Sequence, residues 1–231
     1  MLEVRHLCFA YESGRMILNG ASFVAHPGDL IWLQGTNGSG KTTLLRILAR
    51  LLEAEGELAL HVGGRAIRER SKWLEYVAFS PAEPYLFEYL TGAENVEFLR
   101  SLFAIPAESF AKRFRVWTKR FGLEEALNRP VQEYSLGMRH QLYWAVLAAR
   151  DAAVYLLDEP FSALDDRSRE HCKAWMQEAS QNGKIVVLVT HVAEFGMTAT
   201  RTLRLVEGKI EELRANGKDE SPWGSSNEPS A

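Results

Sequence analysis

The sequence is poor in cysteine and in long hydrophobic runs. Its 231 residues include only two cysteines, Cys8 and Cys172, which stand far apart and lack the spacing of a metal site. We therefore expect two reduced thiols in a cytosolic protein rather than a disulfide. The longest apolar runs, 142–149 and 152–157, are far shorter than the roughly 20 residues that cross a bilayer. Met1 is followed at once by charged, strand-like residues, so we expect no signal peptide, and any membrane role must come through a partner.

An excess of charge of either sign is also missing. The 27 basic and 30 acidic residues give a net charge of −3, which does not favour nucleic acid or an anionic membrane as a partner. A basic face can still be hidden within this neutral total. The composition, 46% hydrophobic and 25% charged, is typical of a globular protein. The length suits one domain, or one domain with a modest inserted lobe.

Hydrophobic patterning predicts a mixed α/β chain. Residues 2–10 alternate as in a strand, and 22–25 continue this pattern after a turn. The turn signal Pro27-Gly28-Asp29 then precedes 30–34, a short apolar run typical of a buried strand. Further strands are expected near 57–62, 76–80, 153–157, 185–190, 202–206 and 209–213. Helices are expected over 43–52, 94–103, 108–121, 136–150 and 166–181.

The order of these elements predicts a parallel sheet with an inserted helical lobe. The strand–helix–strand order over 153–190 favours parallel strands that are buried on both faces. Residues 82–150 form the expected helical lobe, and the last two strands, joined by Glu207-Gly208, form a hairpin. Residues 216–231 are rich in Ser, Gly, Pro, Glu and Asn, and we expect a disordered tail there.

Residues 35–42, Gly-Thr-Asn-Gly-Ser-Gly-Lys-Thr, fit the pattern G-x-x-x-x-G-K-[ST] at every fixed position. The glycines let backbone N–H groups point inward at phosphate oxygens, and the helix that follows directs its positive end at the same charge. We expect Lys41 to bridge the β- and γ-phosphates and the Thr42 hydroxyl to ligate magnesium. A chance glycine-rich turn is the alternative, which the strand–loop–helix context disfavours. The residues expected to bind nucleotide here are Gly35, Asn37, Gly38, Ser39, Gly40, Lys41, Thr42 and Thr43.

A pair of carboxylates, Asp158 and Glu159, ends the apolar run that precedes Pro160. Taken alone, an acidic pair after a strand is more often a solvated turn. Beside a phosphate-binding loop, however, a carboxylate at the end of a neighbouring strand holds magnesium, and this is the role expected for Asp158. Glu159 is then placed to orient or deprotonate the attacking water.

Three further motifs name a family. They are Tyr134-Ser135-Leu136-Gly137-Met138-Arg139, Phe161-Ser162-Ala163-Leu164-Asp165 and Val189-Thr190-His191. With the two motifs above, in this order and spacing, the chain resembles the ATP-binding subunit of an ABC transporter from about residue 2 to residue 213. The resemblance implies a P-loop NTPase core: a RecA-like parallel sheet with an N-terminal antiparallel β subdomain. It also implies an inserted helical subdomain of about 82–150 within an ATP-binding domain of residues 1–215.

The resemblance also implies roles for single residues. Ser135 and Gly137 resemble the signature motif, which contacts the γ-phosphate bound to the opposite subunit, so that two chains close head to tail around two ATP molecules. Asp165 resembles the aspartate at that interface, and His191 resembles the switch histidine that contacts the γ-phosphate. Tyr11 stands where the family places an aromatic ring against adenine.

Each of these residues has an alternative role. Ser135 could simply cap the helix that follows it. His191, alone after a strand, is more often a structural histidine. Tyr11 could serve in packing only.

The chain departs from the family pattern at three positions. Ala82 stands where members usually carry a glutamine that touches magnesium and senses the membrane partner, and alanine can do neither. Glu83 or a water are the substitutes that remain open, or nucleotide sensing is weakened. In the signature segment, Met138 replaces a common glutamine and Gln141 a common arginine.

The resemblance therefore implies an ATPase that uses ATP and Mg²⁺ to power a separate membrane-spanning subunit. Such a chain acts at the cytoplasmic face of the inner or plasma membrane as a homo- or heterodimer. The short length and the segment 90–95 resemble small bacterial export ATPases of the ABC-2 and haem-exporter types, with an importer as the alternative. A nucleotide-gated clamp without transport is less expected, because paired cassettes, long insertions and a basic charge are missing, and no nucleic acid partner is expected.

Overall fold

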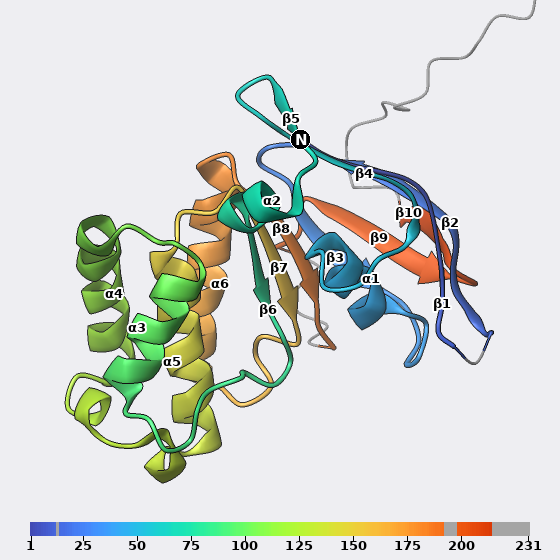
Figure 1. The fold of residues 1–231 in the computed structure, drawn as a ribbon. Coiled ribbons are helices and arrows are strands. Elements are labelled where there is room, and N and C mark those ends of the chain that lie inside the picture. The colour runs from blue at the N-terminus through green and yellow to red at the C-terminus, as the bar shows by residue number, and fades with distance from the viewer. Residues whose placement is uncertain (13, 192–197, 214–231) are drawn as a thin grey trace, which may run out of the picture.

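A computed structural model describes residues 1–12, 14–191 and 198–213 of the chain. These residues form two sheets and a lobe of helices (Figure 1). The strands are β1 (Leu2–Ala10), β2 (Met16–Ala25), β3 (Leu30–Gln34), β4 (Glu55–Val62), β5 (Arg65–Ile67), β6 (Val77–Ser80), β7 (Val154–Asp158), β8 (Ile185–Val189), β9 (Arg201–Val206) and β10 (Lys209–Leu213). The helices are α1 (Lys41–Leu48), α2 (Arg70–Tyr76), α3 (Gly92–Leu102), α4 (Ala107–Phe121), α5 (Leu136–Ala149) and α6 (Asp166–Gln181), with short 3₁₀ turns at Ala126–Asn128 and Val131–Glu133.

The larger sheet has the strand order β10-β9-β3-β8-β7-β6. Strands β9, β3, β8, β7 and β6 pair in parallel, and β10 joins β9 in an antiparallel hairpin. Every residue of β7 and β8 is buried, which is the condition of a parallel sheet covered on both faces. Because the strands are parallel, β3 and β7 present their carboxyl ends at the same edge of this sheet. The loops that carry the predicted phosphate and acidic motifs begin at that edge.

The smaller sheet is antiparallel, with the order β2-β1-β4-β5. Its inner face shares one hydrophobic core with α1 and with the larger sheet. Leu2, Leu18 and Leu60 come from the small sheet, and Leu45 and Leu156 come from α1 and β7. Helix α1 is therefore held between two sheets, which fixes the direction in which its first turn points.

Helices α3, α4 and α5 lie together to one side of the sheets, next to α6 (Figure 1). Their shared core is rich in aromatic residues, including Phe110 and Tyr134. Thr91 and Glu94 form a reciprocal capping box that starts α3. None of the helices in the described ranges has the length and apolar character of a membrane span.

The observed elements confirm the predicted α/β class, the parallel sheet, the N-terminal antiparallel sheet and the helical lobe. Several boundaries were wrong. The helix expected over 43–52 begins at Lys41 and ends at Leu48, because Arg50 adopts the left-handed conformation with φ 58°. The strand expected to resume at residue 22 starts at Met16, and Tyr76 belongs to a helix rather than to β6. Helix α2 and strand β5 were missed. The predicted disordered tail, 216–231, lies outside the described residues.

Candidate nucleotide site

The glycine-rich loop connects β3 to α1. At its end Gly40 has φ 103°, a conformation that side chains rarely adopt, and it serves as the N-terminal cap of α1. A Cβ built on Gly40 would lie only 2.6 Å from Ile17 Cγ2. Gly38 has φ 77°, but nothing lies within 4 Å of the Cβ position there. The loop therefore needs glycine for its backbone conformation at both positions and also for space at Gly40.

Lys41 turns its ammonium group back onto its own loop. Its Nζ donates to the carbonyl oxygens of Gly35 at 2.8 Å and Thr36 at 3.0 Å. An ammonium group has three donors, so two of them hold the shape of the loop. Ser39 Oγ is buried beside them and has no hydrogen-bond partner among the described residues. An orphaned donor and a cationic group at the start of a helix fit an anionic ligand such as phosphate.

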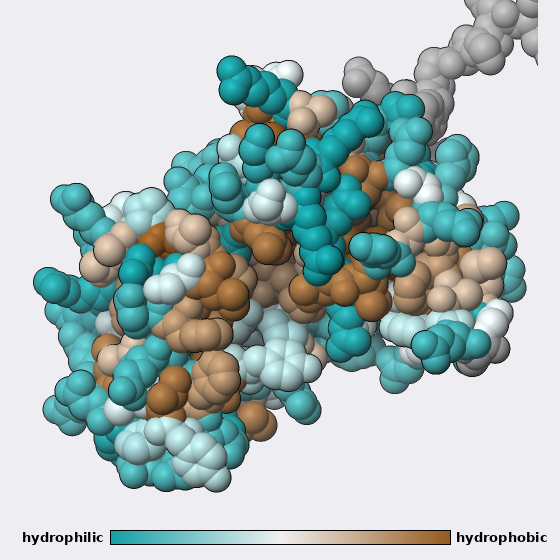
Figure 2. Space-filling view, in the orientation of Figure 1, coloured by the Kyte–Doolittle hydropathy of each residue, from teal (hydrophilic) through white to brown (hydrophobic). Residues whose placement is uncertain are grey.

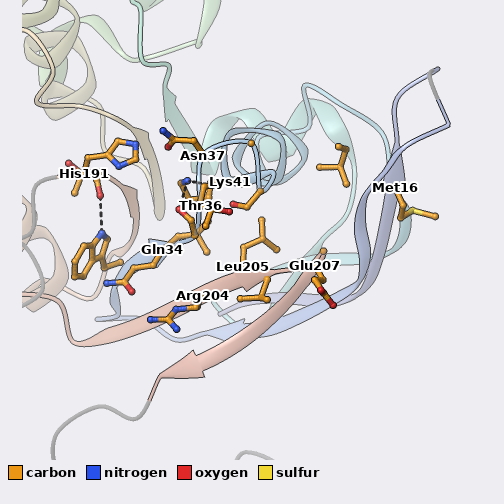
Figure 3. A pocket seen from close by; sticks show the side chains of 18 of the residues that line it. Met16, Gln34, Thr36, Asn37, Lys41, His191, Arg204, Leu205 and Glu207 are labelled. Carbon is orange, nitrogen blue, oxygen red and sulfur yellow. Dashed lines mark hydrogen bonds between the residues drawn. The ribbon is translucent and has the colours of Figure 1, made fainter.

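Two cavities meet at this loop. The larger has a volume of about 800 Å³ and is closed on one side by β9, with Arg204 and Glu207 on its wall (Figure 3). The smaller has a volume of about 470 Å³ and contains the acidic residues. Both are lined by Ile17, Asn37, Gly38, Lys41 and His191. Sequence reasoning missed Ile17, and nothing in the sequence marks this residue of β2 as a wall of the site.

Asp158 ends β7 with 3% of its surface exposed. Burial raises the pKa of its carboxyl, while a hydrogen bond with the Thr42 side chain and the charges of Arg46 and Lys41 oppose that rise. The two residues predicted to ligate magnesium, Thr42 and Asp158, are thus in direct contact. Both offer the hard oxygen ligands that Mg²⁺ prefers.

Glu159 follows in the left-handed conformation with φ 44°, which is uncommon for a residue other than glycine. Its backbone N–H donates to the carbonyl of Val189 at 2.9 Å, which ties the turn to the end of β8. One carboxylate oxygen accepts from the backbone N–H of His191 at 3.3 Å. The other oxygen lies 3.2 Å from His191 Nε2 and is buried without a hydrogen bond among the described residues. The structure therefore brings His191, predicted to contact the γ-phosphate, directly beside Glu159, predicted to orient or deprotonate the attacking water.

The pKa of Glu159 is raised above its ordinary value. Burial is the main cause, and the charge of Asp158 adds to it. The proximity of His191, with its backbone N–H, and the charge of Lys41 act in the opposite direction. A carboxylate with a raised pKa is a stronger base once it is ionised, and carboxyl groups with raised pKa values cluster at functional sites.

Tyr11 lies at the mouth of the smaller cavity with 43% of its surface exposed. Its hydroxyl lies 3.1 Å from Thr43 Oγ1, and its ring packs edge-on against Phe9. The side chain is therefore oriented by two contacts and still offers an exposed ring beside the phosphate loop. The structure brings together most of the predicted residues: Tyr11, Gly38, Gly40, Lys41, Thr42, Thr43, Asp158, Glu159 and His191 line this cavity, and Gly35, Asn37 and Ser39 line the larger one.

Three predicted residues are not part of either cavity. Ser135 and Gly137 lie at the start of α5, in the helical lobe, and Asp165 lies at the start of α6 (Figure 1). Ser135 is exposed and accepts from the backbone N–H of Met138 at 3.2 Å, so it does cap the helix. Asp165 caps α6 by accepting from the N–H of Ser168 at 2.7 Å, and this hydrogen bond lowers the pKa of its carboxyl.

Ala82 follows β6 and lines the smaller cavity together with Asp158 and Glu159. The position expected to carry a glutamine therefore does face the site. Its methyl group supplies neither a ligand nor a hydrogen bond. Glu83, one of the proposed substitutes, is exposed and does not line the cavity.

A strand, a glycine-rich loop and a helix, with a carboxylate pair at the end of a neighbouring parallel strand, define a phosphate-loop nucleoside triphosphatase. Comparison with known proteins gives the family. The model of the family described as ABC transporter matches residues 18–162. The cytochrome c biogenesis ATP-binding export protein CcmA 2 of Cupriavidus metallidurans is 34% identical over 177 residues, or 76% of this chain and 82% of that protein. The SkfA peptide export ATP-binding protein SkfE of Bacillus subtilis is 29% identical over 91% of this chain and 87% of that protein.

Solved structures agree with this result. The structure of an ATP-binding subunit of an ABC transporter has a TM-score of 0.83 at 24% identity, over 92% of this chain and 90% of that one. A dimeric post-hydrolysis state of the ATP-binding cassette MJ0796, bound to ADP and Pi, has a TM-score of 0.78 at 24% identity, over 93% and 100%. The chain belongs to the ABC transporter family and is an ATP-binding, ATPase subunit with the P-loop NTPase fold.

Proposed function

We propose that this chain hydrolyses Mg-ATP at a site completed by a second subunit, and that it thereby powers a separate membrane-spanning exporter. The domain that does so comprises residues 1–215, with a helical subdomain over about 82–150. The contact between Thr42 and the buried Asp158, together with the orphaned Ser39 hydroxyl of the same loop, carries the nucleotide part of the proposal. Magnesium held there supplies positive charge that offsets the charge of the phosphates.

Different residues of the chain bind different parts of the nucleotide. The phosphates bind against the loop residues Gly35, Asn37, Gly38, Ser39 and Gly40, and Thr43 follows this loop in α1. Tyr11 packs its exposed ring against adenine. Lys41 keeps two hydrogen bonds to the loop and turns its third donor to the β- and γ-phosphates.

Glu159 orients a water and accepts its proton, while the water oxygen bonds to the γ-phosphorus and the bond to the β,γ-bridging oxygen breaks, leaving its electron pair on ADP. His191, already bonded to Glu159, positions this carboxylate and contacts the transferred phosphate.

The second half of the site comes from another subunit. Ser135 and Gly137 lie at an exposed helix start that lines neither cavity of their own chain. A helix start of this kind offers N–H groups and partial positive charge to an anion. A solved structure of similar fold is described as dimeric and bound to ADP and Pi. In the dimer that we propose, each chain supplies a phosphate loop to one site and Ser135, Gly137 and Asp165 to the other.

We propose that the membrane-spanning subunit binds to an apolar groove of about 500 Å³. It lies between α3 and the β6–α2 region, and Figure 2 shows hydrophobic side chains gathered over this part of the surface. Phe87, Phe98 and Leu102 are exposed along it, Leu102 to 60%. A hydrophobic surface of this kind, adjacent to the Ala82 segment, suits a protein partner. Binding there places the chain at the cytoplasmic face of the membrane.

Export is the direction we propose. The similar proteins from C. metallidurans and B. subtilis are both described as export proteins, although an importer protein of Vibrio vulnificus, described for sn-glycerol-3-phosphate, is 28% identical over 92% of this chain. No nucleic acid is part of the proposal. The transported substrate is set by the membrane subunit.

A mixing experiment tests the composite site. The variant Lys41→Ala loses the phosphate loop, and Ser135→Asp keeps the helix cap but places a negative charge at the helix-start site, so each is expected to be nearly inactive alone. Mixed dimers restore one intact site, formed by the loop of the Ser135→Asp chain and the helix start of the Lys41→Ala chain. The mixture should release phosphate faster than the sum of the two variants alone. If the mixture equals that sum while wild-type chain is active, the shared site is wrong.

A further inference from the structure

Helix α5 has one face that lies along the segment between β7 and α6. Three residues on this face, Gly137, Gln141 and Trp144, follow the spacing i, i+4, i+7, which places them on one side of a helix. Their contacts are, respectively, Ala163 of this segment, Ser168 in the first turn of α6, and Pro160 of the segment. The segment begins with Glu159 and ends with Asp165, so the contacts fall directly after Glu159, between these two functional residues, and just beyond Asp165.

The contact at Trp144 is a buried hydrogen bond. Its indole N–H donates to the carbonyl oxygen of Pro160 at 2.9 Å, with only 2% of the tryptophan exposed. The ring of Trp144 is held edge-on by Trp175, which is itself packed edge-on against Tyr155 of β7. The indole therefore has little freedom to turn, and it fixes the residue that directly follows Glu159.

The two other contacts support the same segment. Gln141 Nε2 donates to Ser168 Oγ at 2.9 Å, and the backbone N–H of Ser168 holds the carboxylate of Asp165. Gly137 lets the helix approach closely, because a Cβ there would lie 3.0 Å from the carbonyl oxygen of Ala163. Neither Gln141 nor Trp144 was singled out as functional from the sequence, apart from the departure from arginine at 141.

Glu159 needs such support because of its backbone. A residue other than glycine at φ 44° is strained, and it persists only when the surrounding structure holds it there. Its own N–H is tied to Val189 on one side. On the other side the Glu159 carbonyl accepts from the N–H of Ser162 at 3.2 Å, and the carbonyl of Pro160, within that turn, is held by Trp144.

We propose that Trp144 is a positioning residue for Glu159: through Pro160 it sets the direction of the carboxylate that activates water, and with Gln141 it makes α5 the element that links the helix-start site to the catalytic turn. This inference rests on the function proposed above. It predicts that loss of the indole N–H harms the chemical step while nucleotide binding is kept.

The test is Trp144→Phe, which keeps an aromatic ring and removes the donor. The matched control is Trp73→Phe, since Trp73 Nε1 donates to the Leu48 carbonyl at 2.8 Å in an equally buried bond at the far end of α1. For Trp144→Phe we expect kcat of ATP hydrolysis to fall about ten-fold, with KM and Mg-ATP affinity within about two-fold of wild type. For Trp73→Phe we expect kcat within about two-fold.

The readout that separates positioning from a merely structural role is the split between a lowered kcat and an unchanged KM, which a general loss of stability would not give. If Trp144→Phe fails to fold, Gln141→Leu takes its place, with the same expected split between kcat and KM. An unchanged kcat in the folded variant, or an equal loss in Trp73→Phe, overturns the proposal. Equal hydrolysis by wild type and Glu159→Gln would instead sink the proposed function itself.

Discussion

Two glycines of the phosphate loop, Gly38 and Gly40, allow the free-energy cost of its backbone geometry to be estimated position by position. Gly38→Ala meets no neighbouring atom, so it costs only the left-handed backbone conformation, about 1–2 kcal/mol. Gly40→Ala carries at least this conformational cost, because φ 103° lies outside the left-handed well, and in addition it brings its Cβ to 2.6 Å from Ile17 Cγ2. That atom branches directly from the Ile17 Cβ and moves only with its rotamer or backbone. Overpacking of this kind adds about 1–3 kcal/mol.

We therefore expect Gly40→Ala to lose about 2–5 kcal/mol of unfolding free energy and Gly38→Ala about 1–2 kcal/mol. Urea unfolding of the nucleotide-free chain, followed by tryptophan fluorescence, measures both. The urea midpoint should be highest for wild type, lower for Gly38→Ala and lowest for Gly40→Ala. The slopes should be unchanged, because the surface exposed on unfolding stays the same. Equal midpoints for the two variants would refute the reasoning, since Gly40→Ala adds the contact with Ile17 to a conformational cost at least as large as that of Gly38→Ala.

The remaining predictions concern the acidic pair and the groove. Because the pKa of Glu159 is raised and the ionised form accepts the proton, kcat should fall as pH drops through a value above the ordinary glutamate range, which a pH–rate profile checks. Burial also raises the pKa of Asp158, so its ionised form destabilises the nucleotide-free fold as pH rises through that pKa. At neutral pH Asp158→Asn should raise Tm by about 2–4 °C and abolish the stabilisation by Mg-ATP; an unchanged Mg-ATP shift contradicts this. Leu102→Glu should leave Tm within about 2 °C and hydrolysis by the free chain unchanged, while a co-expressed membrane subunit no longer co-purifies.

Much of the architecture follows from local patterns. The alternation over 2–10 and the short apolar runs at 30–34 and 153–157 predict strands because their side chains are buried on one or both faces. The phosphate loop is contiguous in the sequence, so its role in binding phosphate can be inferred without knowledge of the fold. Helix α2 and strand β5 were not predicted because they are only seven and three residues long, which is too short for a periodic hydrophobic pattern.

Other features depend on tertiary packing and have no local signature. Nothing near Glu159 in the sequence indicates a left-handed backbone, since the neighbours that hold it come from β8 and α5. The sequence also gives no sign that Trp144 reaches Pro160 rather than simply filling the core. The position of Ala82, by contrast, could be predicted. The resemblance to the family aligns Ala82 with a glutamine of the nucleotide site, and Ala82 does line the smaller cavity.

The central claim, that this chain hydrolyses ATP with Glu159 as its base, is tested most directly by phosphate release from Mg-ATP by wild type and Glu159→Gln. The substitution keeps the size of the side chain and one acceptor oxygen, replaces the other oxygen by an NH2 donor, and removes the ability to accept a proton. We predict steady release by wild type, and for the variant a fall of at least about 100-fold in kcat with Mg-ATP affinity retained. Hydrolysis by Glu159→Gln at the wild-type rate would contradict the account.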